Sequence, residues 1–383
     1  MTRRLRIFEI VSASTNDAIP GNTVWIRNLH DPLVQMGHDV MLLRAEDARR
    51  ALATNDAEAR DRFSSAVVKR FKREHAKRPF DLFFGYLMDG MIDPAALDEI
   101  RKAGVPTCNF SCNNVHQFGL VDELSPHFDF SLHSERDVGE KFRAVGGTPI
   151  WWPMAANPLF AHPMHVQQRL GASFVGGNYG LRAEYALHLL ESGVDLHLYG
   201  PGWTLSGRVA RAKRRLRRDL TMGAGLVARS LASQAARTAQ AARIDVARRL
   251  ADTYPGNVHQ PVPDEEVIRL YSSSIVSLGF LEVFDEHDPS RPILQHLHLR
   301  EFEAPMSGAL YLTNYSDELA EMFEPDKEVL VWHNRHELLE KVRFYGEHPD
   351  AGDGIRKAGR ERALACHTYE RRFQQLFKEI GIA

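Results

Sequence analysis

The sequence predicts an α/β protein with two doubly wound, Rossmann-like domains. Short β-branched or aromatic runs alternate with helical segments through most of the chain, and repeated βα units form parallel sheets covered by helices. The alternation lapses once, over residues 154–169, and then restarts. At 383 residues the chain is long enough for two domains of roughly 150 residues each.

The first domain is expected to span residues 1–153. Its predicted strands are residues 5–11, 38–43, 81–86, 105–110, 128–133 and 149–153. Its predicted helices are residues 24–36, 47–77, 94–103 and a segment that begins at Ser134, a suitable N-cap. Gly37 and Gly104 follow two of these helices and mark their ends.

The linker at 154–169 contains Pro158 and Pro163, and a second domain is expected at 170–365. Its predicted strands are residues 172–176, 195–199, a short run at 258, 275–280 and 309–313. Its predicted helices are residues 181–192, 264–272 and 299–307. Residues 366–383 form a predicted C-terminal helix that could pack back on the first domain. Ligands of such sheets bind outside the carboxyl ends of the strands, so a site in a cleft between the domains is expected.

The composition excludes several classes of protein. Hydrophobic residues make up 44% of the chain, which argues against disorder. The three cysteines (108, 112 and 366) do not suggest a disulfide framework, and a reducing, cytoplasmic location is the simpler interpretation. We identify no signal peptide and no apolar run of the ~18 residues that a membrane-spanning helix needs.

The near-neutral net charge of −2 conceals a basic insert at residues 205–250. This insert has twelve Lys or Arg against two acids, a net charge of +10, which leaves −12 for the rest of the chain. It could lie on an anionic membrane surface, which would make the protein peripheral at the inner membrane, or dock an acidic partner, or be merely solvated. Because it has no aromatic residue, nucleic acid is not an expected partner.

The segment 298–308 is the strongest candidate for binding chemistry. A helix that begins near Leu299 would present free N–H groups to a diphosphate. Arg300 would add guanidinium donors, and Glu303 has two oxygens suited to a ribose diol. The alternative is an ordinary surface ion pair between Arg300 and Glu303.

Five segments together resemble the CgeB-like glycosyltransferases, which have the GT-B fold and are related to glycosyltransferase families 1 and 4. The segments are residues 175–182 (VGGNYGLR), 198–203 (LYGPGW), 277–280 (SLGF), 299–308 (LREFEAPMSG) and 367–371 (HTYER). Weaker similarity occurs at 21–24 and 37–40. The resemblance implies transfer of a sugar from a nucleotide-diphosphate sugar to a glycan, lipid-linked or protein acceptor, with no cofactor and no obligatory metal.

The resemblance also implies roles for individual residues. Glu303 matches the glutamate that retaining GT-B enzymes place on the donor ribose, and Arg182 matches a basic residue that contacts the diphosphate. The remaining residues on the donor side are Gly177, Asn178, His298, Leu299 and Arg300. Two positions depart from the wider pattern: Gln295 replaces an acid, and Gly177 replaces a second basic residue. Retention of configuration is therefore an expectation.

In the first domain, the candidate acceptor residues follow two predicted strands. They are Asn22, Thr23, Asn113, Asn114 and His116. His116 could act as a base or orient the acceptor, although a loop histidine is more often only polar surface. Cys108, Cys112 and His116 have a spacing that suggests metal binding, but a closed zinc site needs a fourth ligand, so no metal site is predicted.

Two other functions stay open. The departures at Gln295 and Gly177 would also suit a weakened GT-B protein that binds ligands or takes part in an assembly. A nucleotide-sugar epimerase of similar fold is a further alternative.

Overall fold

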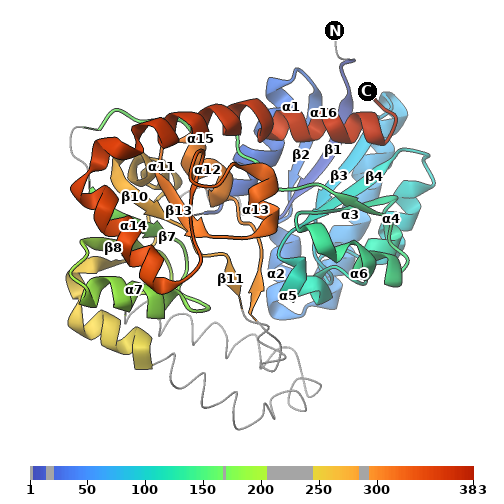
Figure 1. Cartoon of the computed structure of the whole chain (residues 1–383). Coiled ribbons are helices and arrows are strands. Elements are labelled where there is room, and N and C mark those ends of the chain that lie inside the picture. The colour runs from blue at the N-terminus through green and yellow to red at the C-terminus, as the bar shows by residue number, and fades with distance from the viewer. Residues whose placement is uncertain (1–2, 14–20, 167–169, 205–244, 284–292) are drawn as a thin grey trace. The chain divides into compact units, whose positions relative to one another are not determined.

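The structure is a computed structural model that describes residues 3–13, 21–166, 170–204, 245–283 and 293–383 (Figure 1). The chain forms two compact units. The first consists of Met1–Asn157 with Thr368–Ala383, and the second of Pro158–His367. Each is described by itself below.

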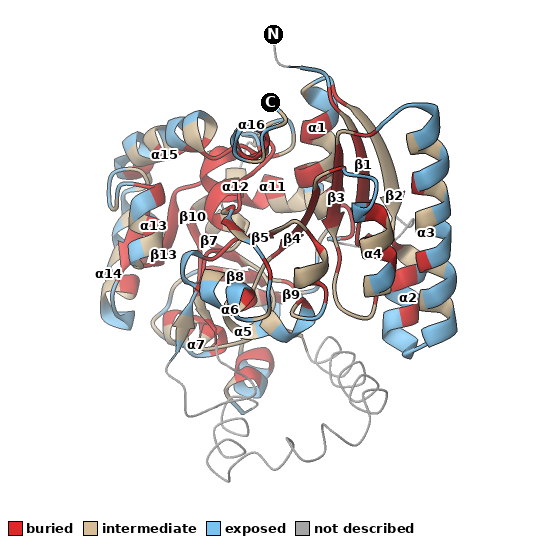
Figure 2. Cartoon of the chain, turned by 90° about the vertical axis from the view of Figure 1, so that its right-hand side faces the viewer, coloured by how far each residue is buried: buried red, intermediate tan, exposed pale blue. Residues whose placement is uncertain are grey.

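The first unit contains a parallel six-stranded sheet in the order β2-β1-β3-β4-β5-β6. The strands are β1 (Arg6–Val11), β2 (Asp39–Arg44), β3 (Leu82–Tyr86), β4 (Thr107–Ser111), β5 (Phe130–His133) and β6 (Pro149–Trp151). Their residues are apolar in long runs because helices cover both faces, and β1, β3 and β4 are almost wholly buried (Figure 2). At the carboxyl edge, Val11 lies beside both Arg44 and Tyr86.

Helices α3 and α4 cover one face of this sheet, and η1, α1 and α16 lie on the other. The helices are η1 (Ile26–His30), α1 (Asp31–Gln35), α2 (Glu46–Thr54), α3 (Ala57–Lys77), α4 (Pro94–Arg101), α5 (Asn114–Gln117), η2 (Phe118–Leu120), η3 (Ser125–His127), η4 (Arg136–Val138) and α6 (Gly139–Ala144). Phe8 and Phe83 join the core beneath α3 and α4, whereas Phe84 points to the opposite face. This alternation follows from the two-residue period of a strand.

The C-terminal helix α16 (Tyr369–Glu379) belongs to the first unit, although its sequence follows the second. Phe373 packs edge-on against Phe84 and Trp152, with ring centroids 5.4 and 5.2 Å apart. The indole N–H of Trp152 donates to the Arg372 carbonyl at 2.9 Å. The helix thus completes the core of a domain that begins more than 300 residues earlier.

The second unit contains another parallel six-stranded sheet, in the order β14-β13-β10-β7-β8-β9. The strands are β7 (Leu170–Val175), β8 (Leu196–Tyr199), β9 (Val258–His259), β10 (Ser274–Leu278), β13 (Tyr311–Asn314) and β14 (Leu330–Trp332). A separate antiparallel pair joins β11 (Glu282–Val283) to β12 (Leu294–Gln295). Phe174, Leu198 and Leu278 enter one core with residues of α7 (Arg182–Glu191) and α14 (Arg335–Glu347).

The remaining helices of this unit complete its layers. They are η5 (Pro255–Asn257), α11 (Asp264–Ser273), α12 (Arg300–Met306), α13 (Asp317–Met322), η6 (Pro349–Gly352) and α15 (Asp353–Cys366). Helix α11 contacts β7 and α12, and α12 also contacts β13 and α15. Two caps follow the usual chemistry: the side chains of Ser316 and Asn334 accept from backbone N–H groups in the first turns of α13 and α14.

Two predictions about helices were wrong. The predicted helix 47–77 is two helices, because Asn55 adopts a left-handed conformation (φ 51°) and Asp56 caps α3 by accepting from the Ala59 N–H. Ser134 is not an N-cap, since η4 begins two residues later and α6 follows it. By contrast, the predicted helix 24–36 is confirmed, because residues 24–35 are helical, with the five-residue π-helix η1 directly before α1.

In each sheet, the strand order reverses beside the first strand of that unit. The chain moves from β1 to β2 on one side and then to β3 on the other, so the first switch point lies between β1 and β3. The second lies between β7 and β10, because β8 and β9 lie on one side of β7 and β10 on the other. Ligands of doubly wound sheets bind at the carboxyl ends of strands at such points.

Most of the basic insert 205–250 lies outside the described residues, as does the part of the first loop before Gly21. Residues 245–253, at the end of the insert and just after it, are helical. Within the described parts of the chain, no helix is long and apolar enough to cross a membrane.

Candidate functional site

The switch point of the second unit gathers most of the residues predicted on the donor side. Gly177 and Asn178 follow β7, Arg182 is the first residue of α7, and His298 precedes α12. The Asn178 N–H donates to the Pro201 carbonyl at 2.9 Å, and its side-chain amide donates to the Gly202 carbonyl at 3.2 Å. These bonds join the chain after β7 to the loop after β8.

Arg182 is almost completely buried, with 1% of its surface exposed. Its guanidinium donates to the carbonyls of Gly177 and Phe280, each at 3.0 Å. Its carbon Cζ also lies 3.5 Å from the centroid of the Tyr179 ring, a close cation–π contact. Burial lowers the pKa of Arg182 to about 10, so the group is still a cation near neutral pH.

Arg300 approaches the same place from α12. Its Nε donates to the Val175 carbonyl at 3.0 Å, and its Cζ lies 5.0 Å from the centroid of the Phe174 ring. A Cβ atom on Gly176 would lie 2.5 Å from Arg300 Nη2, so only glycine lets the guanidinium come this close. Burial lowers the pKa of Arg300. The opposite effect of Glu301 and the nearby tyrosines is larger in sum, so the net direction of the pKa is upward.

Both guanidinium groups keep a buried nitrogen without a hydrogen-bond partner among the described residues. These atoms are Arg182 Nε and Arg300 Nη1. Buried donors that make no hydrogen bond are unfavourable, typically by 1–3 kcal/mol. Because Arg182 Nε and Arg300 Nη1 both lie near the switch point between β7 and β10, this region could stabilise a bound anion.

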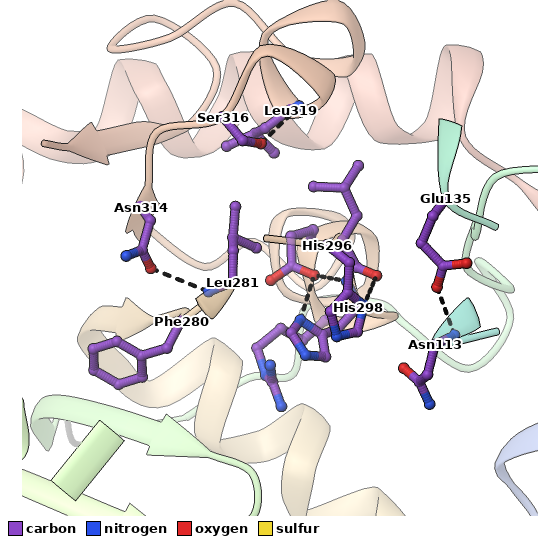
Figure 3. Close-up of polar contacts among 12 residues, drawn as sticks. Asn113, Glu135, Phe280, Leu281, His296, His298, Asn314, Ser316 and Leu319 are labelled. Carbon is purple, nitrogen blue, oxygen red and sulfur yellow. Dashed lines mark hydrogen bonds and ion pairs between the residues drawn. The ribbon is translucent and has the colours of Figure 1, made fainter. Parts of the chain in front are cut away.

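His298 connects the two arginine-bearing segments. Its Nε2 lies 3.2 Å from Arg182 Nη2 and 3.0 Å from the Tyr179 hydroxyl. Figure 3 shows His298 beside His296, and their ring centroids are 4.2 Å apart. His296 and Tyr179 were not among the predicted site residues, although Tyr179 lies inside the segment 175–182 that carries part of the resemblance.

The backbone N–H group just before α12 is bonded within the protein. The carboxylate of Glu301 accepts from the His298 N–H, so this donor is already used by the protein. Leu299 occupies the N-cap position and makes no side-chain capping bond. Glu303 lies one turn after Arg300, with 6% of its surface exposed.

Gln295 and Asn314 organise the chain between β10 and α12. Gln295 is exposed on β12, where its amide donates to the Tyr315 carbonyl at 3.2 Å. Asn314, at the end of β13, accepts from the Leu281 N–H at 3.1 Å, and the Ser316 side chain accepts from the Leu319 N–H nearby (Figure 3). The position where the wider family has an acid is therefore at the surface.

In the first unit, the predicted acceptor residues belong to two groups. Asn113 and Asn114 follow β4, and both donate their N–H groups to the Glu135 carboxylate, at 2.5 and 3.2 Å (Figure 3). Glu135 is buried, which raises the pKa of its carboxyl. His116 lies on α5 immediately after these residues. Glu135 was not predicted from the sequence, although its position just after β5, at the carboxyl end of a strand, could have indicated it.

The second group of predicted acceptor residues follows β1. Asn22 and Thr23 are mostly buried, and Asn22 Oδ1 accepts a long hydrogen bond of 3.4 Å from Arg49. Trp25 lies against Tyr86 with ring centroids 4.8 Å apart, at the switch point between β1 and β3.

The cysteines form neither a disulfide nor part of a metal cluster among the described residues. All three cysteines are free, and burial raises the pKa of the Cys112 thiol to about 12. No group of three or more potential ligands among the described residues is arranged to hold a metal ion.

Comparisons with solved structures decide the fold. Sucrose-phosphate synthase from Thermosynechococcus elongatus aligns over 98% of this chain and 99% of its own, at 13% identity and a TM-score of 0.59. An α-glucosyltransferase solved with UDP and DNA aligns over 98% and 99%, at 12% identity and a TM-score of 0.59. The two parallel six-stranded sheets described above are consistent with the fold of these neighbours. The chain has the GT-B fold.

Other comparisons are consistent with this assignment. AviGT4, a glycosyltransferase of avilamycin A biosynthesis, aligns over 98% of this GT-B chain and 96% of its own, at 16% identity and a TM-score of 0.55. Residues 218–378 match a family model described as glycosyl transferase-like. A search of curated proteins finds no match. The matched region includes α12 and its flanking strands.

Proposed function

We propose that this protein is a glycosyltransferase that moves a sugar from a nucleotide-diphosphate sugar to a glycan, lipid-linked or protein acceptor. The observation that carries the proposal is the pair of buried guanidinium groups, Arg182 and Arg300, at the switch point between β7 and β10. Each keeps an unused donor nitrogen. A nucleotide-diphosphate sugar carries two phosphate groups, and these are the anionic groups that the two guanidinium groups could bind.

The chemistry of sugar transfer needs these charges. When the glycosidic bond to the nucleotide breaks, negative charge builds on the departing diphosphate, and fixed cations lower the energy of that state. Arg182 and Arg300 can do this without a divalent ion, so we propose a metal-independent reaction. Because Glu303 lies one turn beyond Arg300, we assign it to the ribose hydroxyls of the donor.

The neighbours support a nucleotide-sugar donor. HepE from Anabaena was solved with UDP, with UDP and glucose and with UDP-glucose, and the α-glucosyltransferase was solved with UDP. We therefore propose UDP as the first nucleotide to test. Retention of anomeric configuration and membership of the CgeB-like subfamily are parts of the same proposal. Membership rests on the resemblance of the five segments, and retention rests on the match of Glu303 within 299–308.

The acceptor is proposed to bind the first unit at the carboxyl end of its sheet. Asn22, Thr23, Asn113 and Asn114 lie there with His116, which would orient the acceptor hydroxyl or take its proton. Asn113 and Asn114 already donate their backbone N–H groups to Glu135, and the side-chain amide of Asn114 also donates to Glu135 at 3.3 Å, so the side chain of Asn113 is the one proposed to reach the acceptor.

The test is direct binding and turnover by the full chain. We expect UDP to raise the thermal midpoint, because a ligand that binds only the folded state stabilises it. Glu303→Ala and Arg300→Ala should each weaken UDP binding by at least about tenfold, whereas Arg343→Ala, an exposed arginine on α14, should not. If no nucleoside diphosphate or sugar nucleotide changes the midpoint, the proposal is wrong.

A second candidate is a GT-B protein that binds the donor without turning it over. The exposed Gln295, at the position of an acid in the wider pattern, favours this alternative. Release of UDP from a panel of sugar nucleotides separates the two, because tight binding with no release supports the binding protein. Interconversion of donor sugars without an acceptor would instead indicate an epimerase.

The cell compartment and the role of the insert are also proposals. We propose a cytoplasmic protein whose residues 205–250 attach it to an anionic membrane surface or an acidic partner, on the basis of the net charge of +10. Co-sedimentation with vesicles that contain 30% anionic lipid, roughly the range that attracts polybasic segments, should be lost when residues 205–244 are deleted. Equal sedimentation of both chains would contradict the membrane proposal.

A further inference from the structure

Glu301 is a fully buried acid beside the proposed donor site, and the proposed reaction gives it no role. None of its surface is exposed. Its carboxylate accepts from the His298 N–H and from the Tyr311 hydroxyl, and Oε2 also lies 3.6 Å from His298 Nδ1. Burial raises the pKa of Glu301, Arg300 and these hydrogen bonds lower it, and the net direction is upward. A buried acid with so many ordered contacts is a candidate for positioning its neighbours.

The contacts of His298 define which ring nitrogen carries the proton. A guanidinium group can only donate hydrogen bonds. His298 Nε2, which lies 3.2 Å from Arg182 Nη2, therefore accepts a hydrogen bond from Arg182. A neutral imidazole that accepts at Nε2 carries its hydrogen on Nδ1. Glu301 Oε2 lies 3.6 Å from Nδ1, beyond hydrogen-bond distance, and its acceptor oxygen favours a hydrogen at Nδ1 through electrostatic attraction.

The orientation of Arg182 depends on this histidine. Two of its N–H groups are directed at backbone carbonyls, which fixes the plane of the guanidinium. The bond to His298 adds a third direction, and the Tyr179 ring covers one face of the plane. If His298 carried its hydrogen on Nε2, two N–H donors, His298 Nε2 and Arg182 Nη2, would face each other. Their repulsion would displace the guanidinium group of Arg182.

We propose that Glu301 is a positioning residue of the donor site, which holds His298 in the Nδ1–H form so that His298 can orient Arg182 toward the donor diphosphate. The inference rests on the proposed function, because it assigns the diphosphate to Arg182. It adds a relay that runs from Tyr311 on β13 through Glu301 and His298 to Arg182. Glu301 itself does not touch the donor.

The matched control is Glu9 in the first unit. It is also fully buried, and it is also hydrogen-bonded to a histidine, His30, at 2.7 Å. Glu301→Gln and Glu9→Gln therefore each replace one fully buried carboxyl group with an amide. A general effect of losing a buried carboxylate would be seen in both variants, whereas a positioning effect would be seen only in Glu301→Gln.

The experiment combines a spectroscopic signature with donor binding. In the full chain with ¹⁵N-labelled histidine, the His298 signals are identified by their loss in His298→Asn. We expect the wild type to show a protonated Nδ1 and an unprotonated Nε2, and Glu301→Gln to show a mixture of the two forms. The Kd for UDP should rise about tenfold in Glu301→Gln and stay within twofold of wild type in Glu9→Gln.

Two outcomes would overturn the inference. One is a His298 ring with its hydrogen on Nε2 in the wild type. The other is a Kd for UDP that is equal in Glu301→Gln and wild type, or raised equally in both glutamine variants. Failure of the proposed function gives a different result: the wild type binds no nucleoside diphosphate, while the ¹⁵N spectra still report whether Glu301 sets the form of His298.

Discussion

The buried Glu9 and the partly buried His30 form a pair in the first unit, with 2.7 Å between Glu9 Oε2 and His30 Nδ1. Glu9 lies in the middle of β1 with no exposed surface, and its Oε1 has no partner among the described residues. Burial raises the pKa of Glu9. Burial lowers the pKa of His30, but its bond to Glu9 outweighs this and the net direction is upward. The pair therefore holds a proton more tightly in the folded chain than in the unfolded chain.

The pair should make stability depend on pH. Since both folded pKa values lie above the unfolded ones, this contribution is full below about pH 4.5 and is lost as the pH rises through the folded values. Glu9→Gln or His30→Gln alone should cost about 3 kcal/mol, because one buried partner is left uncompensated. The double variant should cost less than the two single changes together, as urea unfolding at pH 6 would measure. Additive losses would show that the two side chains do not interact.

Gly279, one residue after β10, should not tolerate even alanine. A Cβ atom there would overlap the Tyr311 hydroxyl and lie 2.7 Å from Thr313 Oγ1. We expect Gly279→Ala to destabilise the chain by about 2 kcal/mol or more, with partial rescue by Tyr311→Phe, as thermal unfolding would report. Gly256→Ala is the control, because nothing lies within 4 Å of its added carbon. Equal midpoints for the two alanine variants would contradict the packing described here.

Removal of divalent metal should not affect sugar transfer. The charges proposed to balance the departing diphosphate belong to Arg182 and Arg300. Turnover in the presence of EDTA should therefore equal turnover with added Mg²⁺ or Mn²⁺, within about twofold, which is less than half a kcal/mol in the barrier. A loss of tenfold or more that metal restores would mean that a cation takes part in the reaction.

Asp89 should titrate near neutral pH. Burial, together with the neighbouring Asp122, raises the pKa of Asp89 to about 7. The folded chain then keeps a proton that the unfolded chain loses at about pH 4, so this contribution to stability falls as the pH rises from 4 to 7. Asp122→Asn should reduce that fall by about 1 kcal/mol because it removes the like charge. Thermal midpoints at pH 5 and 8 would test this, with the exposed Asp137→Asn as the control.

The features of the fold that depend on local pattern could be predicted from sequence. The α/β alternation is confirmed by the two parallel sheets, and Gly37, Gly104 and Gly193 follow helices with positive φ values of 84°, 71° and 81°. The break between α2 and α3 was missed, although Asn55 and Asp56 are typical of a helix end and a helix cap. Charged residues on both sides concealed it, because they suit the surface of one long helix.

The candidate site was less accessible to sequence reasoning. Arg182 and Arg300 were recognised from a resemblance, but their partners could not be. Arg182 donates to Phe280, 98 positions away, and Arg300 donates to Val175, 125 positions away. Glu301 was overlooked because a glutamate two residues before the proposed ribose ligand gives no local sign of being buried. Such contacts depend on strand order, which a single sequence does not encode in any short segment.

The return of α16 to the first unit has a consequence for how the chain folds during synthesis. Domains that are continuous in sequence can fold on the ribosome as soon as they emerge. Here the rings of Phe373 and Phe377, which lie in the C-terminal helix and are buried in the first unit, are translated after the whole of the second. The sheet face that packs against α16 is therefore covered only by η1 and α1 while about 200 further residues are made. During that interval Phe84 and Trp152 are the surface that a chaperone would bind.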